Sequence, residues 1–143
     1  MRCSRCGLEA DRTDKFCSEC GMFLRDAFVD QRILQAMVLN SEGKQRECRR
    51  DLERLLESEP DDALASHLLG SVYFHQGTLD LAVQCYIRAL ELAPQFVTCS
   101  YDLGVAHYHR GDMPSAIRAF RRCLELDPNY NAAHYRLAVA LFH

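Results

Sequence analysis

Four cysteines near the start of the sequence have the type and spacing needed to bind a metal ion. Cys3 and Cys6 form one C-x2-C pair, Cys17 and Cys20 form a second pair, and a glycine follows each pair. Two tight turns of this kind present four thiolates to one tetrahedral ion, and glycine allows the positive φ that such turns need. Four protein ligands leave no open position for a substrate, so we expect a closed, structural Zn²⁺ site.

The segment that holds these cysteines is poor in residues that could fold it by burial. Leu8 and Phe16 are its main apolar side chains, so bound zinc must supply most of the folding free energy. The alternative is iron bound by the same turns, as in rubredoxins. That metal would make the chain an electron-transfer subunit docked to an oxidoreductase by the rest of the protein.

Composition narrows the class of protein. The chain has 143 residues, a formal net charge of −3 and 48% hydrophobic residues. This length and composition are typical of one globular domain. The near-neutral charge argues against nucleic-acid binding, which needs an excess of Lys and Arg on one face. No apolar run approaches the roughly 18 residues of a membrane span, and the first residues lack the apolar core of a signal peptide. We expect a soluble, cytoplasmic chain with a protein partner, no nucleic acid and no membrane span.

The rest of the sequence contains an internal repeat of 34 residues. Gly43, Gly77 and Gly111 follow this period. Apolar residues at helical spacing precede and follow each glycine, which predicts two helices joined by a turn. A proline closes each second helix, because the residue before proline is pushed out of the α conformation. The other registers that keep the period are Pro60, Pro94 and Pro128; Cys48, Ala82 and Ala116; Leu52, Tyr86 and Phe120; and Leu56, Leu90 and Leu124.

This repeat resembles the tetratricopeptide repeat. The second unit carries the pattern L-G-x2-Y-x3-G-x-L-x2-A-x3-Y-x2-A-L-x3-P from Leu69 to Pro94, and the third unit matches nearly as well from Leu103 to Pro128. The third unit departs from the pattern at His107 and Cys123. We expect both of these, and Cys48 in the first unit, to be core residues.

The resemblance implies an all-α solenoid of three helical hairpins plus one helix. The expected units are about 29–62, 63–96 and 97–130, with a partial unit at 131–143. Neighbouring hairpins must stack, because one hairpin cannot bury its own apolar face. The domains are then a short zinc ribbon at 1–25 and the repeat array at 26–143.

The sequence lacks catalytic motifs and favours a binding module. It has no phosphate-binding glycine loop, no H-E-x-x-H and no triad at motif spacing. We therefore expect that the chain is not an enzyme. We expect a protein-protein interaction adaptor, scaffold or accessory subunit of a larger complex. The resemblance implies that the first helix of each hairpin lines a concave groove, which lacks the basic set by which some family members clamp a carboxylate.

The register predicts which residues line that groove. Aromatic anchors there favour a peptide or helix as the partner. A recurring row of histidines lies at the rim, where the simplest role is a solvated edge and the alternative is a pH-tuned contact. The rows are Ile33, His67, Tyr101 and Tyr135; Met37, Ser71, Val105 and Val139; Asn40, Phe74, Tyr108 and Phe142; and His75, His109 and His143.

The last helical segment, residues 132–143, is apolar around most of its circumference. By register, Leu137 and Leu141 face a second helix that this sequence does not contain. An exposed apolar stripe of this kind marks an interaction site. We expect another chain, either a second copy or a partner helix, to cover it.

Overall fold

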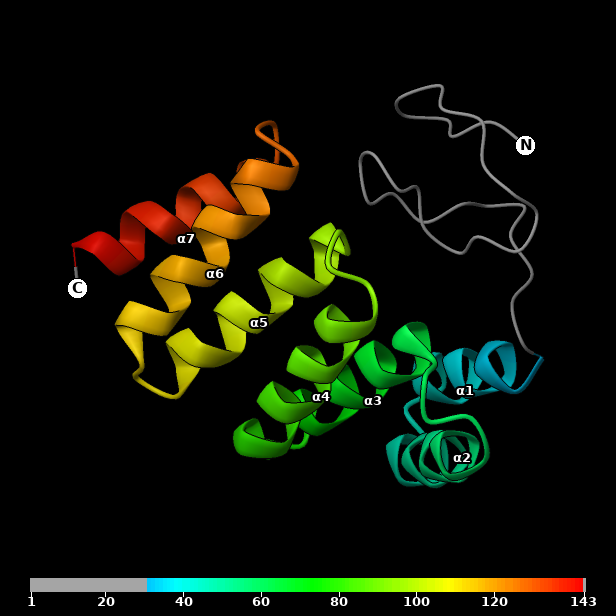
Figure 1. The fold of residues 1–143 in the computed structure, drawn as a ribbon. Coiled ribbons are helices and arrows are strands. Elements are labelled where there is room, and N and C mark those ends of the chain that lie inside the picture. The colour runs from blue at the N-terminus through cyan, green and yellow to red at the C-terminus, as the bar shows by residue number, and fades with distance from the viewer. Residues whose placement is uncertain (1–30, 143) are drawn as a thin grey trace.

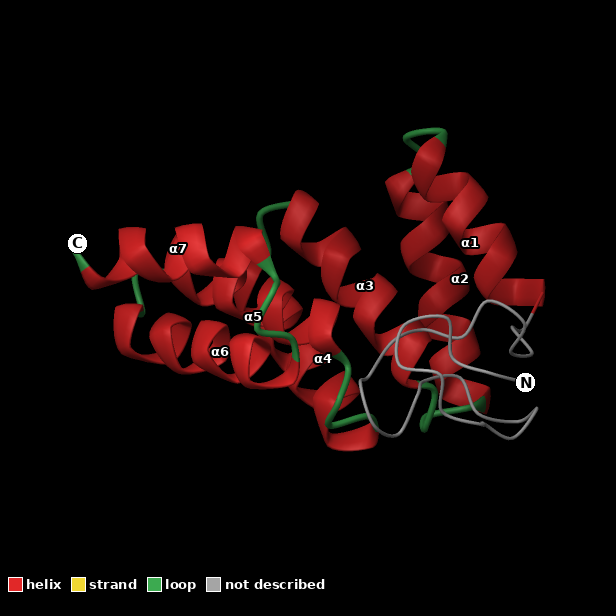
Figure 2. Cartoon of the chain, turned by 90° about the horizontal axis from the view of Figure 1, so that it is seen from above, coloured by secondary structure: helices red, strands yellow, loops and turns green. Residues whose placement is uncertain are grey.

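The computed structural model describes residues 31–142, and every regular element in that range is a helix (Figures 1 and 2). The predicted all-α fold is confirmed for these residues. None of the described helices is long and apolar enough to cross a membrane. The helices are α1 Gln31–Ser41, α2 Gln45–Ser58, α3 Ala63–His75, α4 Leu79–Leu92, α5 Val97–His109, α6 Met113–Leu126 and α7 Asn131–Leu141.

Glycine makes the turn inside each hairpin. Gly43, Gly77 and Gly111 have φ of 78°, 79° and 81°, and no other described residue type has positive φ. A side chain in this left-handed region places Cβ too close to the backbone, which costs roughly 1–2 kcal/mol. The same turn in each hairpin therefore requires the same residue, and this is the physical reason for the glycine period.

Proline ends the second helix of each hairpin, as the sequence predicts. Glu59, Ala93 and Asp127 each precede a proline and have φ between −134° and −141° and ψ between 77° and 93°. These angles lie outside the helical region, because the following proline ring crowds the backbone. The next hairpin begins after this short break.

The hairpins stack so that the odd-numbered helices lie close together. Helix α3 contacts α1 and α5, and α5 also contacts α7, whereas no two even-numbered helices bring Cα atoms within 8 Å in the described part of the chain. Odd-numbered helices therefore form the inner side of the curved stack and even-numbered helices the outer side. Figure 1 shows this succession from α1 to α7.

Close packing holds the two helices of each hairpin together. A Cβ atom added at Gly104 on α5 would lie 2.5 Å from the ring of Phe120 on α6, and one at Gly70 would lie 2.8 Å from Tyr86. The large ring of the second helix thus occupies the space above the glycine of the first. Ile33 belongs to the core of the first two hairpins and is fully buried. The prediction that Ile33 lines the groove is therefore wrong.

Candidate partner-binding site

The surface formed by the odd-numbered helices, called here the inner face, carries most of the residues predicted to bind a partner. Helix α3 supplies three of them, α5 four and the α7 region two. Side chains from successive hairpins meet there because the odd-numbered helices are neighbours. These residues are His67, Phe74 and His75; Tyr101, Val105, Tyr108 and His109; and Tyr135 and Phe142.

An aromatic cluster occupies the C-terminal ends of α3 and α5. The ring of Phe74 lies 5.7 Å from that of His75 and 5.5 Å from that of His109, and the rings of Tyr108 and His109 are 5.8 Å apart. All three pairs have edge-to-face geometry, which aromatic rings favour. Both histidines are exposed. The cluster therefore offers a partner an apolar patch edged by groups that donate or accept hydrogen bonds.

His67 is engaged in a link between two hairpins. Its Nε2 lies 2.6 Å from Oδ2 of Asp102 on α5, and its ring lies 4.7 Å from the ring of Phe96 and 5.6 Å from that of Tyr86. Only 12% of the His67 side chain is exposed. Sequence reasoning missed Asp102, although it is one position away from the 34-residue register of His67. Little of His67 remains for a partner.

The two tyrosines of the same register have different surroundings. Tyr101 packs on Phe120 and Tyr130, with ring centroids 5.9 Å and 5.2 Å away. Tyr135 is 69% exposed. Tyr101 thus contributes partly to the core, whereas Tyr135 presents most of its ring to solvent.

The end of α7 exposes the apolar stripe that the sequence predicts. Leu141 is half-exposed and Phe142, which follows the helix, is 92% exposed. Leu137 is partly buried. Leu137 and Leu141 lie one turn apart on α7, on a different side of the helix from Tyr135, because helix residues two positions apart do not face the same way.

The three residues expected in the core are buried, which confirms that expectation. Cys48 and Cys123 are fully enclosed, and His107 is 9% exposed. The His107 Nδ1 atom lies 3.4 Å from Nη1 of Arg110 and 3.9 Å from a carboxylate oxygen of Asp112. Loss of hydration on burial is the main cause that lowers the pKa of His107, so its imidazole is neutral near pH 7.

The repeat cysteines have the character of packing residues. Burial is the main cause that raises the pKa of Cys123 to about 12 and that of Cys85 to about 11. Thiols of such high pKa are poor nucleophiles and poor metal ligands at neutral pH. Within residues 31–142, no group of three or more His, Cys, Asp or Glu side chains is arranged to hold a metal. Cys3, Cys6, Cys17 and Cys20 lie outside the described residues, as does His143.

Comparison with known proteins places this fold among tetratricopeptide solenoids. Residues 61–129 match the family model for the tetratricopeptide repeat. No curated protein sequence matches the chain. The match and the helical-hairpin stack agree with the predicted architecture of the described residues.

Several solved structures share the fold. A mutant O-GlcNAc transferase from Thermobaculum terrenum is 32% identical with a TM-score of 0.72, over 78% of this chain and 21% of that one. The type III secretion chaperone SycD of Yersinia enterocolitica, in complex with a peptide of the translocator YopD, is 16% identical with a TM-score of 0.75, over 78% and 91% of the two chains. The first repeat domain of Spaghetti, bound to an HSP90 peptide, is 21% identical with a TM-score of 0.74, over 78% and 93%. This chain spans about a fifth of the transferase.

Proposed function

We propose that this chain is an adaptor that binds a peptide or helix of a partner protein on the inner face. The observation that carries the proposal is the aromatic cluster of Phe74, His75, Tyr108 and His109 across two adjacent hairpins. Aromatic side chains bury a large area on binding at a small entropic cost, and they dominate interaction hot spots. A partner that lies across α3 and α5 would cover all four rings.

The fold neighbours support this mode of binding. Two proteins of the same fold are described in complex with peptides, a peptide of YopD in one case and an HSP90 peptide in the other. The ligand chemistry of this chain is expected to differ, because its inner face is aromatic with a histidine rim. An apolar or aromatic segment fits that surface better than a carboxylate does.

The test uses the intact chain to find and then measure the partner. A photo-reactive amino acid at Tyr135, which is well exposed, cross-links bound protein in the source cells, and mass spectrometry identifies it. Tyr108→Ala should then weaken binding of that partner by about 1–4 kcal/mol, the range for hot-spot truncations. The control Arg50→Glu changes an exposed residue of α2 and should change the affinity much less. Equal affinities of Tyr108→Ala, Phe74→Ala and the wild type would exclude the inner face.

We also propose that residues 1–25 form a zinc ribbon with Cys3, Cys6, Cys17 and Cys20 as ligands. The support is the paired C-x2-C-G spacing. Cys17→Ser should remove one equivalent of metal, while the control Cys85→Ser should keep it. Elemental analysis together with an absorption spectrum distinguishes zinc from the iron of an electron-transfer subunit. A full equivalent of tightly bound metal in Cys17→Ser would contradict the assignment.

A further proposal is that a second copy of the chain or a partner helix covers the apolar end of α7. The exposed side chains of Leu141 and Phe142 support it. Leu137 completes the stripe one helical turn earlier.

A further inference from the structure

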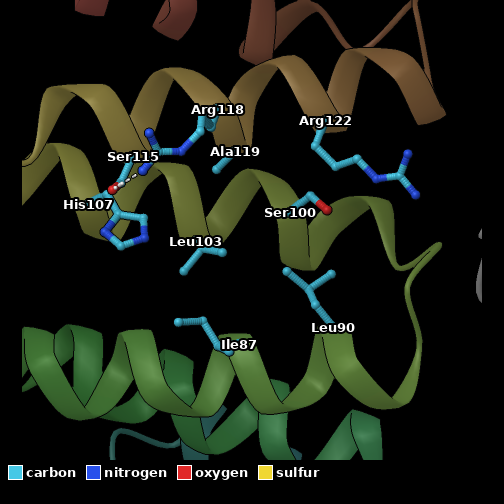
Figure 3. Close-up of a pocket in the computed structure, with 9 residues that line it drawn as sticks. All are labelled: Ile87, Leu90, Ser100, Leu103, His107, Ser115, Arg118, Ala119 and Arg122. Carbon is cyan, nitrogen blue, oxygen red and sulfur yellow. Dashed lines mark hydrogen bonds between the residues drawn. The ribbon is translucent and has the colours of Figure 1, made fainter.

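A second groove lies on the opposite side of the solenoid from the inner face. It runs between α4 and α6 with α5 as its floor, and its volume is about 420 Å³, within the usual range for ligand pockets (Figure 3). We call it the outer groove. Its lining residues are Ile87 and Leu90 from α4; Ser100, Leu103 and His107 from α5; and Ser115, Arg118, Ala119 and Arg122 from α6.

The curvature of the stack produces this groove. Helices α4 and α6 both pack on α5 but do not contact each other. Side chains of α4 and α6 therefore cannot fill the space above α5 completely. Ile87 is left 42% exposed. The walls and floor near it are apolar, with Leu90, Leu103 and Ala119 as its neighbours in the lining.

The charge of the groove has one sign. Its lining includes two arginines and no Asp or Glu. Arg118 lies toward the His107 end and Arg122 toward the Ser100 end (Figure 3). Arg118 donates a hydrogen bond from Nη2 to Oγ of Ser115, 2.9 Å away, and makes no ion pair with any residue of the described range. Arg122 pairs with Glu125 at 3.2 Å on the exposed surface, where such pairs stabilise little and exchange readily.

The other polar groups of the lining carry no negative charge that could pair with Arg118. His107 is engaged with Arg110 and Asp112 at one end. Ser100 is 1% exposed, and its hydroxyl has no hydrogen-bond partner in the described structure. A guanidinium beside apolar surface is suited to a carboxylate, which it binds through two parallel hydrogen bonds.

We propose that the outer groove is a second docking site, for a protein segment in which an apolar side chain is flanked by Asp or Glu. The apolar side chain would lie against Ile87, Leu90 and Leu103. A carboxylate next to it would bind Arg118, and a second carboxylate could replace Glu125 at Arg122. Nucleic acid fits less well, because the walls are aliphatic and the aromatic ring of the lining, that of His107, is 9% exposed and engaged by Arg110 and Asp112, which leaves little of it for a base to stack on. The chain could then hold two partners, one on each side.

The experiment selects ligands from a display library of random 12-residue peptides on the full-length protein. Binding of the enriched peptides is then measured by fluorescence polarisation. Arg118→Glu should lower the affinity for peptides that carry Asp or Glu beside an apolar residue by about tenfold or more, since it removes a charge-assisted contact and adds repulsion. Its control is Arg121→Glu, an exposed arginine of α6 that does not line the groove.

A second pair of variants tests the apolar part of the groove. Ile87→Glu should abolish binding of the same peptides, whereas Leu81→Glu should not. Leu81 lies on the same helix, is 41% exposed and does not line the groove. Tyr108→Ala should leave these peptides unaffected, which separates this site from the inner face.

Three results would overturn the proposal. The first is a set of enriched peptides without acidic residues beside apolar ones. The second is equal binding of these peptides to Arg118→Glu, Ile87→Glu and the wild type. The third is competition by a single-stranded oligonucleotide at equal concentration, which would identify nucleic acid as the better occupant.

Discussion

Gly104→Ala tests the packing that holds α5 and α6 together. The added Cβ would lie 2.5, 2.7 and 3.0 Å from three carbons of the Phe120 ring. Two carbon atoms in ordinary van der Waals contact are about 3.5 Å apart or more, so the ring or the helix must move by about 1 Å. Phe120 is fully buried and stacks near Tyr101, 5.9 Å between centroids, so it has no free space to enter.

The magnitude follows from two opposing effects. Overpacking a core costs about 1–3 kcal/mol, and the shortest approach here places this substitution in the upper half of that range. Alanine regains about 1 kcal/mol of helix propensity relative to glycine. The free energy of unfolding should therefore fall by about 1–2 kcal/mol.

Urea unfolding followed by circular dichroism measures this change, and a second substitution identifies its cause. In a Phe120→Leu background the clash is relieved, so Gly104→Ala should cost nothing or stabilise the fold by up to about 1 kcal/mol. Gly111→Ala is the contrast, because no atom lies within 4 Å of its added Cβ and its φ is 81°. Its cost comes from the backbone alone and should be the same in both backgrounds. Equal effects of Gly104→Ala with and without Phe120→Leu would refute the reasoning.

Four further predictions concern single sites. Burial lowers the pKa of His107, so as the pH falls this histidine is protonated in the unfolded chain at a higher pH than in the folded protein. The free energy of unfolding should therefore decrease as the pH drops below about 6.5. His107→Gln should flatten that part of the stability profile, measured between pH 7.5 and 5.5. Ser100→Ala should raise the free energy of unfolding by about 1 kcal/mol, because it removes a buried hydroxyl that has no partner in the described residues. With a pKa of about 11, the Cys85 thiol should react with iodoacetamide at pH 8 about two orders of magnitude more slowly in the native protein than in urea, as peptide mapping would show. Leu137→Glu combined with Leu141→Glu should reduce the sedimentation coefficient of any assembly that uses the end of α7, and an unchanged coefficient would remove that face from consideration.

Binding at the outer groove and binding at the inner face should differ in their dependence on ionic strength. A partner on the inner face contacts aromatic rings and should tolerate salt well. A partner in the outer groove depends on Arg118, so its affinity should fall as ionic strength rises, although less than for a fully exposed pair. Salt dependence of two isolated complexes would therefore indicate which face each one uses.

The repeat pattern alone is enough to predict the helical hairpins of the described range. Turn glycines, the prolines that end the second helices and the apolar period act locally or between neighbouring hairpins, so a repeated pattern is enough to predict them. The small positions above large rings, such as Gly104 opposite Phe120, also follow from the register. The buried state of Cys48 and His107 was predictable for the same reason.

Packing between hairpins determines which of the predicted site residues are exposed to a partner. His67 and Tyr101 share a register with Tyr135, but His67 pairs with Asp102 and Tyr101 packs on Tyr130, whereas Tyr135 remains exposed. Register gives the direction of a side chain and not what the adjacent hairpin places against it. The outer groove depends on the separation of α4 and α6, which both contact α5 but do not contact each other. That separation results from the packing of all three helices together, so no local pattern in the sequence specifies it.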